Sequence, residues 1–235
     1  MRELNYIDET NENNKKPALR IGSVGRSFSF LEKPSIKIIK DSWENISLQE
    51  TPDLIFLDPP FDYDYNKLLK LDANVIAVFS RGKYVFPYLV GKINQGYGYH
   101  SVCNLTPANG VNAPTMPSNT FEIIHILRKG KCYFNHSFAL KVIGKEGKKA
   151  PAVINIGRPT TGINFYKYAK GLKVFLYLLA YVEEGAKVFD PFCGIANSAE
   201  ASKLRNCKYI GCDIDDIAIK NKRNDLFTDV AYIGF

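Results

Sequence analysis

The sequence predicts a doubly wound α/β domain with a mostly parallel sheet. Three observations support this fold class: short apolar runs alternate with helical patterns, two of these runs end in Asp-Pro, and 235 residues suit a single domain. Alternation of strands and helices is typical of βαβ units, in which parallel strands are buried on both faces. We expect one domain over residues 35–235, preceded by a polar N-terminal arm at residues 1–34.

The first strands of the domain are read from two runs. Residues 36–41 (IKIIKD) alternate weakly between apolar and charged side chains, which indicates a strand that ends at Asp41, and a short helical turn follows. Residues 52–60 contain the continuous apolar run LIFL, which is typical of a buried parallel strand. Pro59 and Pro60 end this strand, because proline has no backbone N–H to donate to a neighbour.

A third strand is expected at residues 74–80 (NVIAVFS), and a helix at residues 83–93, with Pro87 near its start or kinking it. Residues 94–119 are rich in Gly, Asn, Pro and Ser, so they are expected to form a loop. A loop of this length within a compact domain is uncommon unless the segment is functional or mobile.

Residues 120–131 (TFEIIHILRKGK) return to a strand pattern that ends at Gly130. Residues 133–164 are mixed and basic, and their pattern assigns no element. Residues 170–185 fit a helix with Gly185 as its C-terminal cap, because apolar residues recur at helical spacing on one face. These residues are Leu172, Phe175, Leu176, Leu179 and Val182.

The C-terminal part alternates again between strands and helices. A strand and loop are expected at 186–194, a helix at 197–206, a strand at 208–215 and a helix at 216–225. The tail DVAYIGF fits a last strand.

Charge and composition narrow the function classes. The net charge of +7 fits either a basic solvated surface or attraction to a polyanion, and basic residues cluster near Tyr and Phe at 128–134, 141–149 and 220–225, as suits nucleic acid. Five cysteines without a CxxC and three scattered histidines predict neither a metal site nor a disulfide framework. With no apolar run long enough for a membrane span or a signal peptide, we expect a cytoplasmic protein with reduced thiols.

The strand end VFDPFCGIA resembles part of a nucleoside-binding unit. Asp190 comes first, small residues then allow close approach of the backbone to a ligand, and Asp213 ends the next strand about 20 residues later, where an acid can bind ribose hydroxyls. The glycine pattern is not GxGxxG, and Asp190 would repel a pyrophosphate. An acid here suits a positively charged ligand such as S-adenosylmethionine. The alternative is an ordinary strand–loop–helix with capping acids.

The strand end LIFLDPPF places a carboxylate, a rigid carbonyl and a ring side by side. Asp58 and the carbonyl of Pro59 could accept both protons of an exocyclic amine while Phe61 stacks on the attached base. Holding both N–H groups out of the plane of the base would free the amine lone pair for attack on a methyl sulfonium, and a base in duplex DNA must first be flipped out. The alternative is a strand ended by an Asx-Pro turn.

Together, DPPF, FEIIHILRKGK and DPFCG, in this order, resemble the β class of DNA amino-methyltransferases over roughly residues 35–225. The resemblance implies a single Rossmann-like methyltransferase domain with a circularly permuted motif order, because the catalytic motif precedes the cofactor motif. It implies catalytic roles for Asp58, Pro59, Pro60 and Phe61. It also implies that S-adenosylmethionine is held by Asp41, Lys170, Asp190, Phe192, Cys193, Gly194, Ala196 and Asp213, with Asp215 the alternative ribose-binding acid.

Two positions depart from the family pattern. Gly171 stands where a proline follows the lysine, and Ala196 replaces the second glycine of DPFxGxG. Alanine tolerates most backbone conformations other than those with φ > 0, so we expect weaker or shifted cofactor binding rather than its loss. Cys193 fills the variable position of the loop and is expected to be a packing residue, not a nucleophile.

The resemblance places a small target-recognition insert at residues 133–164. Its basic residues either contact DNA phosphates or form a solvated loop. They are Lys141, Lys145, Lys148, Lys149 and Arg158.

The sequence therefore predicts a site-specific, S-adenosylmethionine-dependent DNA methyltransferase that flips its target and modifies adenine N6, without a metal. The aspartate that opens DPPF favours adenine over cytosine. Cytosine N4, RNA as substrate, and a non-catalytic nucleic-acid-binding module remain alternatives. Double-stranded DNA is the expected partner, no membrane is expected, and the resemblance also allows a homodimer and a cognate restriction endonuclease.

Overall fold

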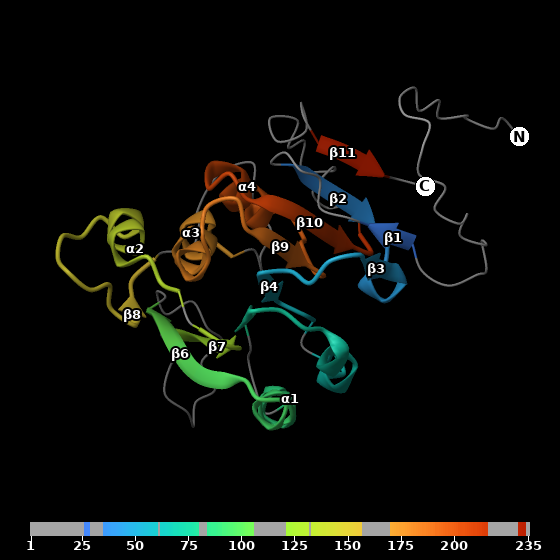
Figure 1. Cartoon of the computed structure of the whole chain (residues 1–235), viewed down its shortest axis with the longest axis horizontal. Helices are drawn as coiled ribbons and strands as arrows, with labels where there is room; N and C mark the ends of the chain where they lie inside the picture. Colours follow the sequence, from blue (N-terminus) through green and yellow to red (C-terminus); the bar gives the residue numbers. More distant parts are fainter. Residues whose placement is uncertain are drawn as a thin grey trace, which may run out of the picture.

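The fold is described from a computed structural model. The structure describes residues 26–28, 35–60, 62–79, 84–105, 121–131, 133–156, 170–215 and 230–233. For the first and last of these segments it describes only the backbone. Figure 1 shows one large twisted sheet crossing the molecule, with helices on both of its faces.

The main sheet has nine strands within the described part of the chain. All neighbouring strands are parallel except β7, which is antiparallel to both β5 and β6. The predicted mostly parallel α/β fold is therefore confirmed. In spatial order the strands are β11 (Val230–Ile233), β2 (Ile36–Lys40), β10 (Lys208–Asp213), β9 (Lys187–Asp190), β4 (Leu54–Leu57), β5 (Val75–Phe79), β7 (Phe121–Arg128), β6 (Gly98–Leu105) and β8 (Val153–Ile154).

Two apolar cores lie on the two faces of this sheet. Along β4, Leu54 and Phe56 belong to one core and Ile55 and Leu57 to the other, because successive side chains of a strand point to opposite faces. All four are buried, as a continuous apolar run in a parallel strand predicts.

Helices cover both cores. The first core packs against α3 and α4, and the second against η1, η2 and α1. Among the described residues, no helix combines the length and the hydrophobicity that crossing a membrane requires. The helices are η1 (Trp43–Asn45), η2 (Tyr65–Lys70), α1 (Val85–Asn94), α2 (His136–Val142), α3 (Leu172–Leu178), η3 (Leu179–Tyr181) and α4 (Asn197–Leu204).

A small parallel pair lies beside the main sheet. It joins β1 (Arg26–Phe28) to β3 (Ile46–Leu48), so a short strand of the segment predicted as an arm pairs with the domain. The other residues of segment 1–34 lie outside the described residues.

The loop predicted over residues 94–119 is wrong in part, because β6 occupies Gly98–Leu105. This strand reads GYHSVCNL and has only two buried residues, Val102 and Asn104. It is held by antiparallel pairing with β7 along its whole length rather than by an apolar run of its own, which is why the local pattern concealed it. Residues 106–119 lie outside the described residues.

The helix predicted over residues 170–185 is shorter than expected. It consists of α3 followed by the tighter turn η3, and the backbone of Val182 is extended, with its N–H donating to the carbonyl of Leu179. Gly185 has φ of +83° but lies in the turn before β9, not at a helix end. The strand predicted in the tail is confirmed as β11, whereas the helix predicted at 216–225 lies outside the described residues.

The strand order fixes where a ligand can bind. The chain leaves β9 toward β10 on one side, and β4 leads to β5 on the other, so β9 and β4 flank a topological switch point at the carboxyl edge of the sheet. Because β7 runs antiparallel, its beginning lies at this same edge: Ile124 pairs with Phe79, the last residue of β5.

Candidate active site

A cavity of about 620 Å³ opens at the carboxyl edge of β4, β9 and β10. The two Asp-Pro strand ends do share one rim, as the sequence predicted. Most of the residues expected to bind or transform a ligand line this cavity: Asp41, Asp58, Pro59, Pro60, Lys170, Asp190, Phe192, Cys193, Gly194 and Asp213.

The lining is strongly acidic although the whole chain carries a charge of +7. Among the described residues that line the cavity, Lys170 is the single lysine or arginine, against eight carboxylic acids. This charge balance suits a positively charged ligand and disfavours a phosphate. No group of three or more His, Cys, Asp or Glu side chains within the described part of the chain could hold a metal ion. The acids are Asp41, Glu44, Asp58, Asp62, Glu122, Asp190, Asp213 and Asp215.

Lys170 joins two of these acids. Its Nζ lies 3.2 Å from Oδ1 of Asp58, at the end of β4, and 3.0 Å from Oε1 of Glu122, at the start of β7. Burial lowers the pKa of Lys170, but the two carboxylates outweigh burial and leave that pKa above its usual value. The lysine is therefore charged at neutral pH. The backbone carbonyl of Lys170 accepts a 2.7 Å hydrogen bond from Nδ2 of Asn197, which ties this segment to α4.

Asp190 is a buried acid at the end of β9. Its Oδ1 accepts from the backbone N–H of Phe192 at 3.0 Å, and its Oδ2 accepts from the hydroxyl of Ser198 at 2.6 Å. Ser198 in turn shares a 2.8 Å hydrogen bond with Tyr209 of β10. Burial raises the pKa of Asp190 to about 7, and its hydrogen bonds compensate only in part. A cation bound nearby would favour the ionised form.

Asp213 ties the loop after β9 to the end of β10. Its Oδ2 accepts from the N–H of Gly194 at 2.8 Å and its Oδ1 from the N–H of Asp215 at 3.0 Å. Burial raises the pKa of Asp213. The side chain of the next residue, Ile214, is 70% exposed beside the cavity, so the acid sits next to an apolar surface that a planar ring could cover.

Ala196 lies in the loop after β9 that is predicted to bind the cofactor. It has φ of +61° and ψ of +32°, the conformation that alanine tolerates poorly, and Gly194 has φ of +50°. The left-handed conformation costs an L-residue about 1–2 kcal/mol relative to glycine. The loop backbone therefore adopts the conformation that a glycine would favour, with the alanine methyl group fully buried rather than lining the cavity.

The same loop is packed by buried sulfur atoms. Cys193 is buried, and burial raises the pKa of its thiol well above the usual value, which agrees with a packing role rather than a nucleophilic one. Its N–H donates to the carbonyl of Cys212 in β10 at 3.0 Å.

Aromatic side chains form the wall near Asp41. The indole N–H of Trp43 donates to the hydroxyl of Tyr63 at 2.8 Å, and Tyr63 meets Phe192 edge-on with ring centroids 5.1 Å apart. Asp41 accepts from the N–H of Ser42 at 2.7 Å and from Nδ2 of Asn45 at 2.8 Å, so its carboxylate is fixed at the rim. Phe61, the predicted stacking ring, lies outside the described residues.

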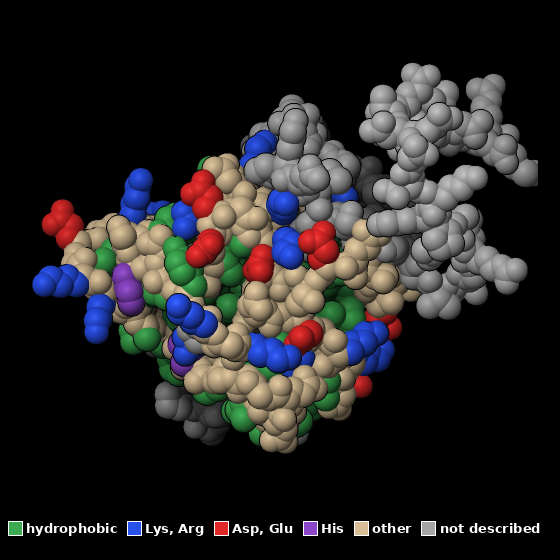
Figure 2. Space-filling model, viewed as in Figure 1, with side chains coloured by type: hydrophobic (Ala, Val, Ile, Leu, Met, Phe, Trp, Pro, Cys, Tyr) green, Lys and Arg blue, Asp and Glu red, His purple; other side chains and the backbone are tan. Residues whose placement is uncertain are grey.

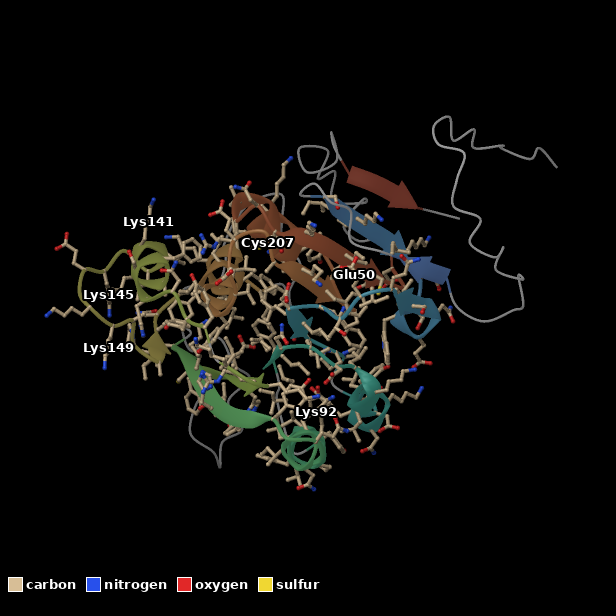
Figure 3. All side chains as sticks on the ribbon, viewed as in Figure 1. Glu50, Lys92, Lys141, Lys145, Lys149 and Cys207 are labelled. Atoms are coloured by element: carbon tan, nitrogen blue, oxygen red, sulfur yellow. The ribbon has the colours of Figure 1, made fainter. Side chains whose placement is uncertain are left out.

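The predicted DNA-contacting lysines are not in the cavity. Lys141 lies on α2 and Lys145, Lys148 and Lys149 on the turn after it, and all four are exposed. We call α2 and residues 143–149 the basic lobe. Figure 2 shows basic side chains projecting around this lobe, and Figure 3 shows the side chains of Lys141 and Lys149 pointing away from the body of the molecule. Arg158 lies outside the described residues.

Glu122 is a site residue that sequence reasoning missed. It stands in the strand pattern FEIIHILR, where an acid among apolar residues at a buried position indicates a charged partner. The side chain of Glu122 is 4% exposed. The sequence contained this signal, but it did not identify Lys170 as the partner.

Solved structures show which fold this is. The M1.HpyAVI complex with S-adenosylmethionine matches with a TM-score of 0.63 at 16% identity, over 81% of this chain and 98% of the other. The cytosine-N4-specific PvuII DNA methyltransferase matches with a TM-score of 0.52 at 10% identity, over 89% and 95%. The chain has a Rossmann-like methyltransferase fold.

A third match agrees with this assignment. The putative DNA modification methylase TTHA0409 of Thermus thermophilus has a TM-score of 0.57 at 10% identity, covering 85% of this chain and all of the other. No family model and no curated protein sequence matches the chain. The methyltransferase fold thus rests on structural similarity, and a permuted motif order within it stays a prediction.

Proposed function

We propose that this protein is an S-adenosylmethionine-dependent DNA amino-methyltransferase that modifies adenine N6. The observation that carries the proposal is the convergence of Asp58, Asp190 and Asp213 on one cavity at the switch point of a methyltransferase fold. Each acid ends its own parallel strand or directly follows it, so the sheet places all three on one rim.

The cavity fits S-adenosylmethionine chemically. Its volume of about 620 Å³ lies in the range of ligand sites, and its acidic lining complements the ammonium and sulfonium charges of this cofactor. In this proposal Asp213 accepts hydrogen bonds from the ribose hydroxyls, and Asp41 accepts one from the adenine amine beside Ile214. The loop from Asp190 to Gly194 would hold the methionine end. When bound, the cofactor supplies an electrophilic methyl group.

Asp58 and Pro59 would hold the target amine. The Asp58 carboxylate and the Pro59 carbonyl accept one N–H each, which turns the amine lone pair toward the methyl group. Pro60 keeps this acceptor pair rigid, and its own carbonyl accepts from the N–H of Tyr63 at 3.1 Å. The product amine loses one proton, for which the Asp58 carboxylate is the adjacent acceptor.

The distribution of charge fits a flipped base. A cavity lined by acids repels the phosphate backbone but admits an uncharged base, and the exposed lysines of the basic lobe can contact phosphates outside it. Residues 133–164 would then act as a small target-recognition insert on double-stranded DNA. A homodimer and a cognate restriction endonuclease stay predictions.

Cytosine N4 is the second candidate target. The structural similarity to a cytosine-N4-specific enzyme favours it, whereas the aspartate that opens DPPF favours adenine. Both bases present an exocyclic amine, so the acceptor pair serves either.

The test is a methylation assay with the whole chain. The protein is incubated with methyl-labelled S-adenosylmethionine and either unmethylated genomic DNA or RNA, and the nucleic acid is digested to nucleosides for separation. We expect label in N6-methyladenine. Label in N4-methylcytosine would support the second candidate, label only with RNA would overturn DNA as substrate, and no label with any nucleic acid would overturn the proposed function.

A further inference from the structure

From the cluster formed by Lys170, Asp58 and Glu122 we infer that Lys170 donates a hydrogen bond to the ring nitrogen beside the target amine. Glu122 is the positioning residue that holds the lysine there. The inference rests on the proposed function and assigns base selection to residues of the same cavity.

The three side chains differ in exposure. Asp58 is 32% exposed toward the cavity, whereas Lys170 is 11% and Glu122 4% exposed. Lys170 thus bridges an inner acid and an outer acid. Its Nζ also lies 5.5 Å from the centroid of the Phe79 ring, which together with Glu122 limits how far the ammonium can move inward.

Because of Glu122, Lys170 does not form an ion pair with Asp58 alone. With two carboxylates at 3.0 and 3.2 Å, the single positive charge of Lys170 is shared. Without Glu122, the ammonium would form a one-to-one ion pair with Asp58, because a charge in a largely buried site needs a partner. Asp58 would then be a poorer acceptor for the amine, and Lys170 would be drawn away from the base.

Asp58 and Lys170 together match the hydrogen-bonding edge of a base on which an amine donor lies beside a ring-nitrogen acceptor. In adenine and cytosine the exocyclic amine is a donor, and the neighbouring ring nitrogen is an acceptor. Guanine and thymine present the reverse, a carbonyl acceptor beside a ring N–H. An acceptor and a cationic donor side by side therefore accept amino bases and reject keto bases, because a reversed edge would place the carbonyl oxygen of the base against the Asp58 carboxylate and its ring N–H against the Lys170 ammonium.

The hydrogen bond from Lys170 also determines which nitrogen of the base is methylated. The ring nitrogen beside the amine has an in-plane lone pair that competes as a nucleophile, and a hydrogen bond from Lys170 occupies that lone pair. The amine, held by Asp58 and Pro59, is then the nucleophile that remains.

The experiment replaces one atom of the substrate. After the methylated site has been mapped on genomic DNA, duplexes are made with adenine or 1-deazaadenine at the target, each opposite an abasic position so that loss of base pairing does not differ. The wild-type protein should methylate the 1-deazaadenine duplex about 10- to 100-fold more slowly, the range expected when a hydrogen bond to a charged group is removed. If the target is cytosine, 3-deazacytosine takes the same place.

The variants test the assigned residues. In Lys170→Met the ratio of the two rates should fall to about 1, with calorimetric affinity for S-adenosylmethionine retained. In Glu122→Gln the rate on adenine should fall and the ratio should shrink, whereas Glu50→Gln, which removes a surface partner of Lys187 at 3.3 Å, should leave both unchanged. Partial unfolding lowers both rates equally and does not change the ratio, so it cannot imitate the expected result.

Some outcomes would overturn the inference while the proposed function stands. Equal wild-type rates on the two duplexes would mean that no donor reaches the ring nitrogen. An unchanged ratio in Lys170→Met, with reduced cofactor affinity, would assign the lysine to the cofactor instead. Absence of methylation on any DNA by the wild-type protein would overturn the proposed function itself.

Discussion

The acidic cavity and the basic lobe place opposite charges in opposite kinds of structure. Two acids of the cavity, Asp190 and Asp213, stand at the ends of sheet strands, are fully or partly buried, and are fixed by hydrogen bonds from neighbouring backbone N–H groups. The lysines of the basic lobe stand on a seven-residue helix and the turn after it, exposed to solvent. Buried, fixed charges select the orientation and protonation of a ligand, whereas exposed, mobile charges supply attraction that salt screens.

The first prediction removes one acid of the cavity. Asp58→Ala should lower the methylation rate by about 10²- to 10³-fold, the decrease typical of removing one preorganised catalytic hydrogen-bonding group. Affinity for S-adenosylmethionine, measured by calorimetry, should stay within about twofold, because the proposed function assigns Asp58 to the target amine and not to the cofactor. A variant that binds both DNA and cofactor and keeps the wild-type rate would contradict the assigned role.

The second prediction concerns the basic lobe. Changing Lys148 and Lys149 together to Gln should weaken DNA binding and reduce the slope of log K against log salt by about 0.9 for each phosphate that the protein no longer neutralises. Fluorescence anisotropy over a salt series measures both the affinity and the slope, and cofactor affinity should not change.

A matched double variant provides the control. Lys203 and Lys208, changed together to Gln, remove the same charge from the end of α4 and the start of β10. If both double variants weaken DNA binding equally, the basic lobe is not the contact surface.

The third prediction is a pH effect confined to the cavity. Because the pKa of Asp190 is about 7, a cofactor with positive charge binds best when this acid is ionised. The affinity of the protein for S-adenosylmethionine should fall by up to about tenfold for each pH unit below 7 and level off above 7. Asp190→Asn should bind more weakly and lose this dependence, while DNA binding by lysines should not follow it.

Without cofactor, the free energy of unfolding should depend on pH in the opposite direction. The folded-state pKa of Asp190 lies above its ordinary value of 3.8, so the folded protein binds more protons between about pH 4 and 7. The contribution of this group to the free energy of unfolding is therefore fully present below about pH 4 and disappears as the pH rises through 7. Urea unfolding of wild-type protein and Asp190→Asn over this range measures it, and identical pH profiles would contradict the assignment.

The fourth prediction is the smallest. Ala196→Gly should raise the free energy of unfolding by about 1 kcal/mol, because a glycine at φ of +61° would not be strained. This corresponds to about 2–4 °C in Tm for a chain of this size. Ala199→Gly, inside α4, should instead cost about 0.5–1 kcal/mol. A lower Tm for Ala196→Gly would show that packing of the buried methyl group outweighs the strain.

Prediction from sequence succeeded where local pattern carries the information. The run LIFL, buried on both faces, and the two Asp-Pro strand ends gave the sheet and its rim, because parallel strands place their carboxyl ends on one edge. It failed at β6, whose polar residues are held in the sheet by β7, and at α3, which ends before the predicted Gly185. In both cases tertiary pairing or turn geometry overrode a local preference.

By itself, the sequence determined the fold class, the acids at the strand ends and the basic segment after β7, because a local pattern in a short contiguous stretch indicates each of them. Only the tertiary structure decided that Glu122 meets Lys170 beside Asp58, because the antiparallel course of β7 brings its first residues to the rim where the parallel strands end. Likewise it decided that Ala196 takes a left-handed conformation. Such contacts depend on strand direction and register between distant segments, which no local pattern specifies.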